Sequence, residues 1–257
     1  MLVDLVLYNA KIYTTKGLVT AGLAIDEGKI FKIAKETNLP NSSKKLNLRG
    51  NIILPGVIDS HVHLRDQQLA YKEDFSSGTA AAAAGGVTAV MDMPNNNPVT
   101  MDSKSLRERM RLAKTQVLVN VAFYSAFPEN LEEMALIVEE GAVAFKLYLS
   151  EKVGGLNIND NESLMRAFNK AVEMNIPVAV HAEDREMLER SREEMERTGK
   201  DDIEAYIKVH SPSAEEKAIN RVARLARKTG APVHFCHLSS LAGLQAFSAM
   251  KKAGLSV

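Results

Sequence analysis

The chain has 257 residues, 46% of them hydrophobic, which is enough for one large domain or one domain with a small appendage. Lysine plus arginine and aspartate plus glutamate each number 32, and this balance argues against nucleic acid or an anionic membrane as the main partner. The single cysteine, Cys236, excludes an intramolecular disulfide and fits a reducing, cytoplasmic compartment.

Residues 1–51 differ in pattern from the rest of the chain. Apolar and polar residues alternate with a period of two over several short stretches, which Gly, Asn and Asp turn signals separate. A small antiparallel sheet element is predicted here. Asp4 and Lys11 interrupt the first stretch, so it does not match a signal peptide, and no run approaches the roughly 20 apolar residues of a membrane helix.

From residue 52 to residue 257, strand patterns alternate with helix patterns. Each predicted strand is a short, nearly continuous apolar run, as expected for strands that are buried on both faces. The predicted strands are 52–58, 87–91, 117–123, 142–147, 177–180 and 232–236, and 255–257 is expected to open a seventh. The predicted helices are 77–84, 103–114, 129–139, 161–174, 185–209, 213–228 and 240–253, the fifth of them a charged, solvated excursion.

This alternation predicts an α/β fold, either a TIM-like (β/α) barrel or a doubly wound sheet. The barrel is favoured because residues suited to chemistry follow successive strands, where barrel enzymes place their sites. About six of the eight units are accounted for. An open barrel, completion by another or a swapped chain, and a fragment of a longer protein are the alternatives.

The first strand leads into DSHVHLR, which places His61 and His63 two residues apart. In an extended segment both imidazoles project to the same face, where two neutral imidazoles can hold one divalent cation. Two histidines at a polar strand end are an equally good interpretation of this motif by itself. Arg65 follows two residues later, on the same side if the chain stays extended.

Two further strand ends carry polar side chains of interest. Residues 92–98, DMPNNNP, present Asn95 on a loop stiffened by prolines. Lys146 lies between Phe145 and Leu147, and burial there disfavours its charged form. A neutral amine can react with carbon dioxide to give a carbamate, a bidentate anion that can bridge two metals. From this segment alone, a lysine whose ammonium group reaches the barrel mouth is the better interpretation.

The remaining histidines come from the later strands. His181 and His237 occur where apolar runs meet polar loops, as expected of metal ligands at a barrel mouth. His234 is three residues from His237, so we expect it on the opposite side of the strand, in a structural role. His210 is interpreted as a solvent-facing residue between helices.

Five segments together resemble the dihydroorotase family of the amidohydrolase superfamily, from the amino terminus to Val257. They are PGVIDSHVHLRD, KEDFSSGTAAAAAGGVTAVMDMPNNNP, FKLYLSE, VHAED and HFCHLSS. HVHLR and MPN are the most specific, because other cyclic amidohydrolases generally lack this arginine and asparagine in combination. The family usually has MPNT, and Asn96 departs from that pattern.

The resemblance implies a centre of two zinc ions bridged by a carbamylated lysine and a hydroxide. His61 and His63 would hold the more buried ion, and His181 and His237 the second. The full set of implied metal ligands is His61, His63, Lys146, His181 and His237. Arg65 and Asn95 would bind the free carboxylate of the substrate, for which a planar guanidinium is well suited.

The catalytic acid and base of the family is an aspartate after the eighth barrel strand, beyond Val257, so the catalytic residue of this chain is unknown. Carboxylates near the ligands are not assigned that role. Asp92 is expected to pack at a strand end, and Glu183 and Asp184 to cap the following helix.

The resemblance implies a cytoplasmic dihydroorotase of pyrimidine (UMP) biosynthesis. Such an enzyme hydrolyses (S)-dihydroorotate reversibly to N-carbamoyl-L-aspartate, a small-molecule substrate pair. Without the missing barrel segments, the activity of these residues alone is an open question. The alternatives are another cyclic amidohydrolase, such as a hydantoinase, dihydropyrimidinase or allantoinase, and a non-catalytic scaffold subunit. A homo-oligomer or an aspartate transcarbamoylase is the expected protein partner.

Overall fold

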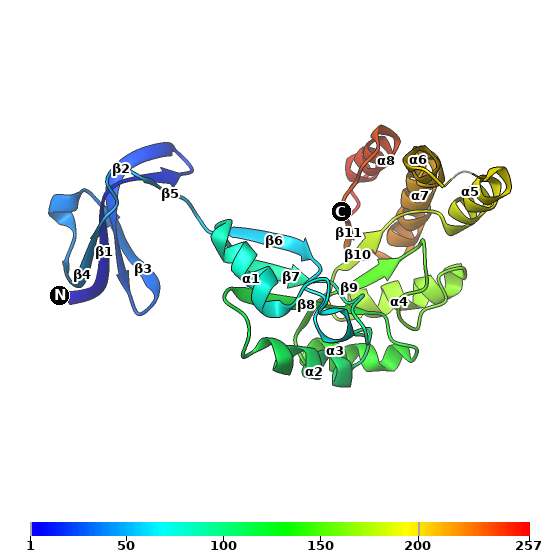
Figure 1. Cartoon of the computed structure of the whole chain (residues 1–257), viewed down its shortest axis with the longest axis horizontal. Coiled ribbons are helices and arrows are strands. Elements are labelled where there is room, and N and C mark those ends of the chain that lie inside the picture. The colour runs from blue at the N-terminus through cyan, green and yellow to red at the C-terminus, as the bar shows by residue number, and fades with distance from the viewer. Residues whose placement is uncertain (1, 200) are drawn as a thin grey trace. The chain divides into compact units, whose positions relative to one another are not determined.

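The computed structural model describes residues 2–199 and 201–257, which form two compact units, Met1–Val57 and Ile58–Val257 (Figure 1). The sequence pattern placed the boundary between residues 51 and 52. In the structure the strand Ile52–Ile53 (β5) pairs with the first strand of the chain and therefore belongs to the first unit. Each unit is described by itself.

The first unit is a five-stranded sheet. Its other strands are β1 (Leu2–Thr14), β2 (Gly17–Asp26), β3 (Lys29–Ala34) and β4 (Asn41–Asn47), with the short 3-10 helix η1 (Glu36–Asn38) before β4. The prediction of an antiparallel element is wrong in part. β1–β2 and β2–β3 are antiparallel, but β4 and β5 pair with β1 in parallel, because the chain crosses over after β3 before it rejoins the sheet.

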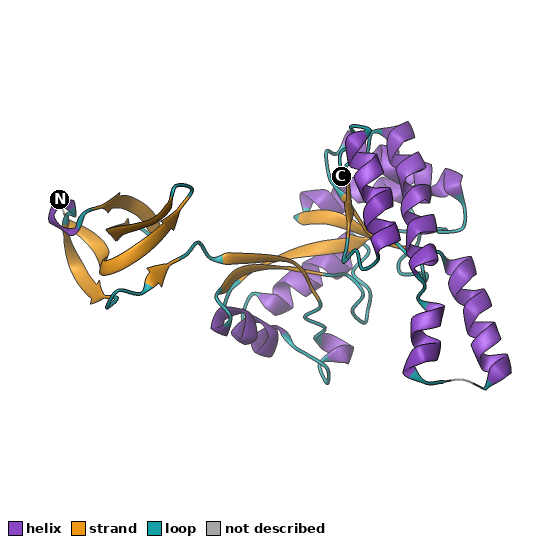
Figure 2. Cartoon of the chain, turned by 90° about the horizontal axis from the view of Figure 1, so that it is seen from above, coloured by secondary structure: helices purple, strands orange, loops and turns teal. Residues whose placement is uncertain are grey.

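The second unit contains one sheet of six strands in the order β11-β10-β9-β8-β7-β6, which curves with helices on its outer side (Figures 1 and 2). The pairs from β7 to β11 are all parallel. The strands are β6 (Val57–Val62), β7 (Val87–Asp92), β8 (Asn120–Ala126), β9 (Ala142–Tyr148), β10 (Val178–His181) and β11 (Val233–Phe235). This arrangement confirms the predicted partial (β/α) barrel with a separate small amino-terminal sheet.

Two strands start later than predicted, for physical reasons. The apolar run at Ile52 and Ile53 serves the first unit, and Pro55, which has no backbone donor, separates it from β6. Val117 and Val119 pack against the core from a connection before β8, where the backbone of Leu118 donates to the Thr79 hydroxyl at 3.1 Å. Residues 255–257 are not in a strand, although the Val233 backbone donates to the Ser256 carbonyl at 3.0 Å.

The helices begin at polar caps that satisfy their free backbone donors. Asp74, Asp102, Asp160, Asp184, Asp202, Ser211 and Ser240 each accept a hydrogen bond at a helix start. The helices are α1 (Phe75–Ala84), α2 (Ser103–Ala113), η3 (Leu131–Glu133) with α3 (Met134–Glu139), α4 (Asn161–Glu173), α5 (Arg185–Thr198), α6 (Ile203–Val209), α7 (Pro212–Thr229) and α8 (Leu241–Lys252).

The charged excursion is two helices, where one stretch was predicted. Gly199 ends α5 with a left-handed φ of 65°, a conformation that glycine adopts without strain. α5 and α6 lie against each other and project from the barrel unit (Figure 2). No helix within the described residues is long and apolar enough to cross a membrane.

Candidate metal centre

Four histidines meet at the carboxyl ends of three barrel strands. His61 lies in β6 and His63 directly follows it, and their Nε2 atoms are 3.2 Å apart. His181 is the last residue of β10, and its Nδ1 is 3.1 Å from Nε2 of His237, which follows β11. The rings of His61 and His237 are 5.1 Å apart between centroids, so the two pairs adjoin.

The spacing of each pair fits ligands of a shared cation. With Zn–N bonds of about 2.05 Å and tetrahedral angles, two ligating nitrogens lie about 3.3 Å apart. Within residues 2–199 and 201–257, no group of three or more His, Cys, Asp or Glu side chains forms a ready metal site. The histidines are two pairs, and Lys146, the fifth predicted ligand, offers no oxygen to a metal until it is carbamylated.

The position of His237 depends on a break in the strand geometry. β11 ends at Phe235, and His237 has a left-handed φ of 38°, which directs the chain so that its ring meets His181. His234 was expected on the opposite side of the strand from the site. It lies instead in register with Ala179, and Ala179 with Lys146, so all three share one face of the sheet. The prediction assumed that the strand continues to His237, with side chains alternating between its two faces. The strand ends at Phe235 instead, so His234 and His237 can both face the site.

Lys146 is buried beside both pairs, with only 1% of its surface exposed. Its Nζ donates to Sγ of Cys236 at 2.8 Å and lies 5.0 Å from the centre of the Tyr148 ring. Burial lowers the pKa of Lys146, and the neighbouring Cys236 opposes that shift only in part. Lys146 therefore does not reach solvent, and its burial shifts it toward the neutral amine, the form that reacts with carbon dioxide.

The histidines near Lys146 are held in their neutral form. Burial lowers the pKa of His61 to about 3 and that of His63 to about 4. For His61 the next cause is the charge of Lys146, and for His63 it is the charge of Arg65. Burial also lowers the pKa of His237, with the neighbouring His181 as the second cause. Neutral imidazoles are the form that binds metal.

Asn95 and Arg65 lie beside the first pair. Oδ1 of Asn95 is 2.7 Å from Nδ1 of His63 and accepts a hydrogen bond from it, which leaves the His63 Nε2 lone pair directed at His61. Nη1 of Arg65 donates to the Asn95 carbonyl oxygen at 3.3 Å. The side-chain oxygen of Asn95 thus orients His63. The Arg65 guanidinium lies next to Asn95, at the same edge of the sheet.

A buried ion pair fixes this edge, and sequence reasoning did not identify it. Arg109 of α2 donates through Nε and Nη2 to Asp92 at 3.0 and 2.7 Å, and both side chains are 1% exposed. Its Nη1 donates to the Arg65 carbonyl at 2.6 Å, and Asp92 accepts from the Leu64 backbone at 2.8 Å. Arg65, Asp66 and Gln67 all have positive φ, between 50° and 57°.

Two residues near the second pair differ from the sequence interpretation. Asp184 caps α5 as predicted, but Glu183 does not. The two oxygens of Glu183 lie 2.8 Å from Nε2 of His181 and 2.8 Å from Nδ1 of His210. His210, expected to face solvent, is therefore half-buried against the site. His210 is 27 residues from Glu183 in the sequence, so the VHAED motif alone could not predict this contact.

A buried polar group also points to a missing partner at the centre. The Tyr148 hydroxyl is enclosed without a hydrogen-bond partner among the described residues, and burial raises the pKa of Tyr148 well above its usual range. A buried phenol normally has a partner. The donor set and this unpaired hydroxyl fit a polar group bound between the strands.

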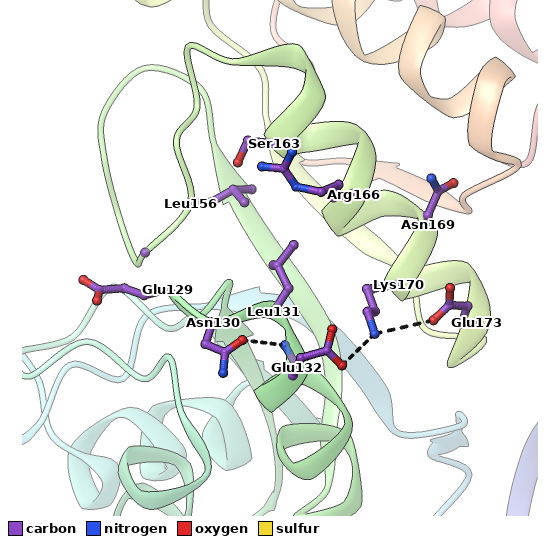
Figure 3. Close-up of a pocket in the computed structure, with 11 residues that line it drawn as sticks. Glu129, Asn130, Leu131, Glu132, Leu156, Ser163, Arg166, Asn169, Lys170 and Glu173 are labelled. Atoms are coloured by element: carbon purple, nitrogen blue, oxygen red, sulfur yellow. Dashed lines mark hydrogen bonds and ion pairs between the residues drawn. The ribbon is translucent and has the colours of Figure 1, made fainter.

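Two cavities are relevant to the choice of site. One of about 470 Å³ lies between η3 and α4 (Figure 3), where Lys170 pairs with Glu132 at 2.9 Å and with Glu173 at 3.9 Å. None of the predicted site residues lines it. Another, of about 370 Å³, is lined by His181, His237 and their neighbours and so adjoins the histidines.

Comparison with known proteins shows the family to which this chain belongs. Residues 52–254 match the model of the amidohydrolase family. A dihydroorotase from Methanosarcina mazei is 32% identical over 93% of this chain and 52% of that protein, and an allantoinase from Solibacter usitatus is 32% identical over 95% and 53%. An L-hydantoinase structure from Arthrobacter aurescens has a TM-score of 0.92 and 26% identity, over 99% of this chain and 57% of that one. The chain spans about half the length of the relatives it matches.

Proposed function

Because this chain belongs to the amidohydrolase family of cyclic amide hydrolases, we propose that it supplies the metal centre and the substrate carboxylate site of a dihydroorotase. The observation that carries this proposal is the guanidinium of Arg65, held at the Asn95 carbonyl beside the His61–His63 pair. A hydrolase of uncharged rings has no chemical need for a cation there.

The residues present fit two zinc ions. His61 and His63 would hold one through Nε2, and His181 Nδ1 and His237 Nε2 the other, with a carbamate on Lys146 between them. Zinc ions bound there would activate a water molecule and polarise the amide carbonyl of the substrate.

The residues of the chain supply orientation and charge. Arg65 would bind the carboxylate of dihydroorotate and fix the ring relative to the histidines. Asn95 would keep His63 in the tautomer with a free Nε2. Burial of Lys146 would favour its neutral amine, the form that reacts with carbon dioxide to give a carbamate. The cytoplasmic location, the homo-oligomer and the aspartate transcarbamoylase partner stay predictions.

A second candidate is an allantoinase or hydantoinase activity. It is favoured by the allantoinase relative, which is as similar in sequence as the dihydroorotase, and by the L-hydantoinase structure. The two functions differ in what Arg65 would contact, because an uncharged ring presents no carboxylate to it.

The metal centre is tested by the zinc content of the purified chain. We expect two zinc ions per chain after purification in the presence of zinc and bicarbonate, measured by atomic emission. Zinc-free protein that still unfolds cooperatively would contradict the proposal.

Arg65→Ala tests the substrate class. We expect this variant to bind dihydroorotate roughly 10- to 100-fold more weakly by calorimetry, because a hydrogen bond to a charged group contributes about 1.5–3 kcal/mol. Binding of uncharged dihydrouracil and the zinc content should not change. Arg111→Ala, which removes an exposed arginine paired with Glu108, is the control. Equal losses for both ligands would count against a carboxylated substrate.

A further inference from the structure

Glu183 is placed to act on the second histidine pair. It follows β10 by two residues and lies between the site and the α6–α7 connection. One oxygen contacts Nε2 of His181 and the other Nδ1 of His210, each at 2.8 Å. Among the described residues, no lysine or arginine pairs with Glu183, whereas the adjacent Asp184 pairs with Lys217 at 2.9 Å.

These contacts determine which nitrogen of His181 is free. A carboxylate only accepts hydrogen bonds, so Nε2 of His181 must carry the proton. The Nδ1 lone pair is then unprotonated and lies 3.1 Å from Nε2 of His237.

His210 is itself held in position. Its backbone donates to the Tyr206 carbonyl at 3.1 Å, its ring lies 4.4 Å from that of Tyr206, and the next residue, Ser211, caps α7. The imidazole therefore presents Nδ1 to Glu183 from a connection between two helices. Without it, the second carboxylate oxygen would have no described partner, and the side chain would be free to rotate away from His181.

We propose that Glu183 and His210 are positioning residues that fix His181 as a metal ligand and so set the affinity of the second zinc. This inference rests on the proposed metal centre. A helix-capping role does not account for Glu183, since Asp184 accepts the capping hydrogen bond of α5. A carboxylate that orients a ligating imidazole raises its basicity and limits its motion, and loss of such a partner typically weakens metal binding.

The experiment titrates the metal-free chain with zinc against a competing chelator. His181→Ala first identifies the zinc that depends on this histidine. Glu183→Gln and His210→Ala are expected to weaken that zinc by roughly 10- to 100-fold and to leave the other unchanged. The glutamine retains one acceptor for two donors, so both orienting bonds cannot persist.

Two matched variants separate positioning from general support of the fold. His210→Asn retains an amide donor near the place of Nδ1 and is expected to restore most of the affinity. Glu189→Gln, on the exposed face of α5 where Glu189 pairs with Arg185, is expected to bind both ions like the wild type. Thermal unfolding of each metal-free variant checks the fold.

The outcomes are distinguishable. Selective weakening with recovery in His210→Asn supports the inference. Unchanged zinc affinity in Glu183→Gln and His210→Ala, or equal loss of both ions with a lower melting temperature of the metal-free chain, overturns it and leaves the metal centre standing. Failure of the wild-type chain to bind zinc overturns the metal centre and the inference together.

Discussion

Lys146→Ala is expected to remove most of the bound zinc. Lys146 is 1% exposed, and burial lowers its pKa, so its neutral amine can add to carbon dioxide, forming an N–C bond and releasing a proton to water. The resulting carbamate would give both ions an anionic oxygen ligand. Alanine leaves two neutral imidazoles for each ion. Zinc content by atomic emission should fall from two ions to one or none per chain.

Two further measurements identify the cause of that loss. A short carboxylic acid such as propionate is expected to restore part of the zinc, because it can occupy the space vacated by the lysine and supply two oxygens. Protein equilibrated with ¹³C-bicarbonate should show a carbamate carbon signal in wild type and in the control Lys152→Ala, whose lysine is exposed. Unchanged zinc in Lys146→Ala, with no carbamate signal in the wild type, would refute the bridge.

Arg109→Met is expected to destabilise the barrel unit by about 3–5 kcal/mol, a large share of the stability of a typical domain. The substitution leaves Asp92 buried at 1% exposure without its cation and removes the donor to the Arg65 carbonyl. Urea unfolding of the metal-free chain, followed by circular dichroism, measures the change.

A double substitution tests the reason for this effect. Asp92→Asn retains an acceptor for the Leu64 backbone but removes the buried charge, so Arg109→Met with Asp92→Asn should be more stable than Arg109→Met alone. Arg107→Met, which breaks an exposed ion pair with Glu140, should change the unfolding midpoint little. A double variant no more stable than the single one would show that lost packing, not unpaired charge, dominates.

The parts of the site that depend on strand ends could be predicted from sequence. Parallel strands place their carboxyl ends at one edge, so His61, His63, His181 and His237 had to come near one another once the barrel was inferred. The ligand roles remain proposals, but the proximity follows from the pattern. The limits of β6 could not be predicted, because the apolar run 52–58 is divided between two sheets: Ile52 and Ile53 pair with β1, whereas Val57 and Ile58 begin β6.

The partners of these residues could not be predicted because they depend on loop paths and side-chain reach. Arg109 lies in α2, a helix rich in charged residues, yet its guanidinium is buried and donates to Asp92. Cys236 meets Lys146 across 90 residues of sequence. His210 became a site neighbour only through the turn between α6 and α7. The hydrophobic periodicity of strands (two residues) and helices (3.6 residues) does not predict such contacts between distant side chains.

The positive φ values of Arg65, Asp66 and Gln67 have a consequence for the proposed carboxylate site. Residues other than glycine adopt that conformation at about 1 kcal/mol or more each, and the bond from Arg109 to the Arg65 carbonyl helps to maintain it. The free-energy cost of this backbone strain is incurred during folding, before any ligand binds. The Arg65 guanidinium also donates to the Asn95 carbonyl at 3.3 Å, so a carboxylate that binds there, as proposed, would meet a side chain that has already lost part of its conformational freedom. If this edge is the proposed carboxylate site, part of its selectivity comes at the expense of folding stability, and a loop without positive φ would make the unit more stable and the site less selective.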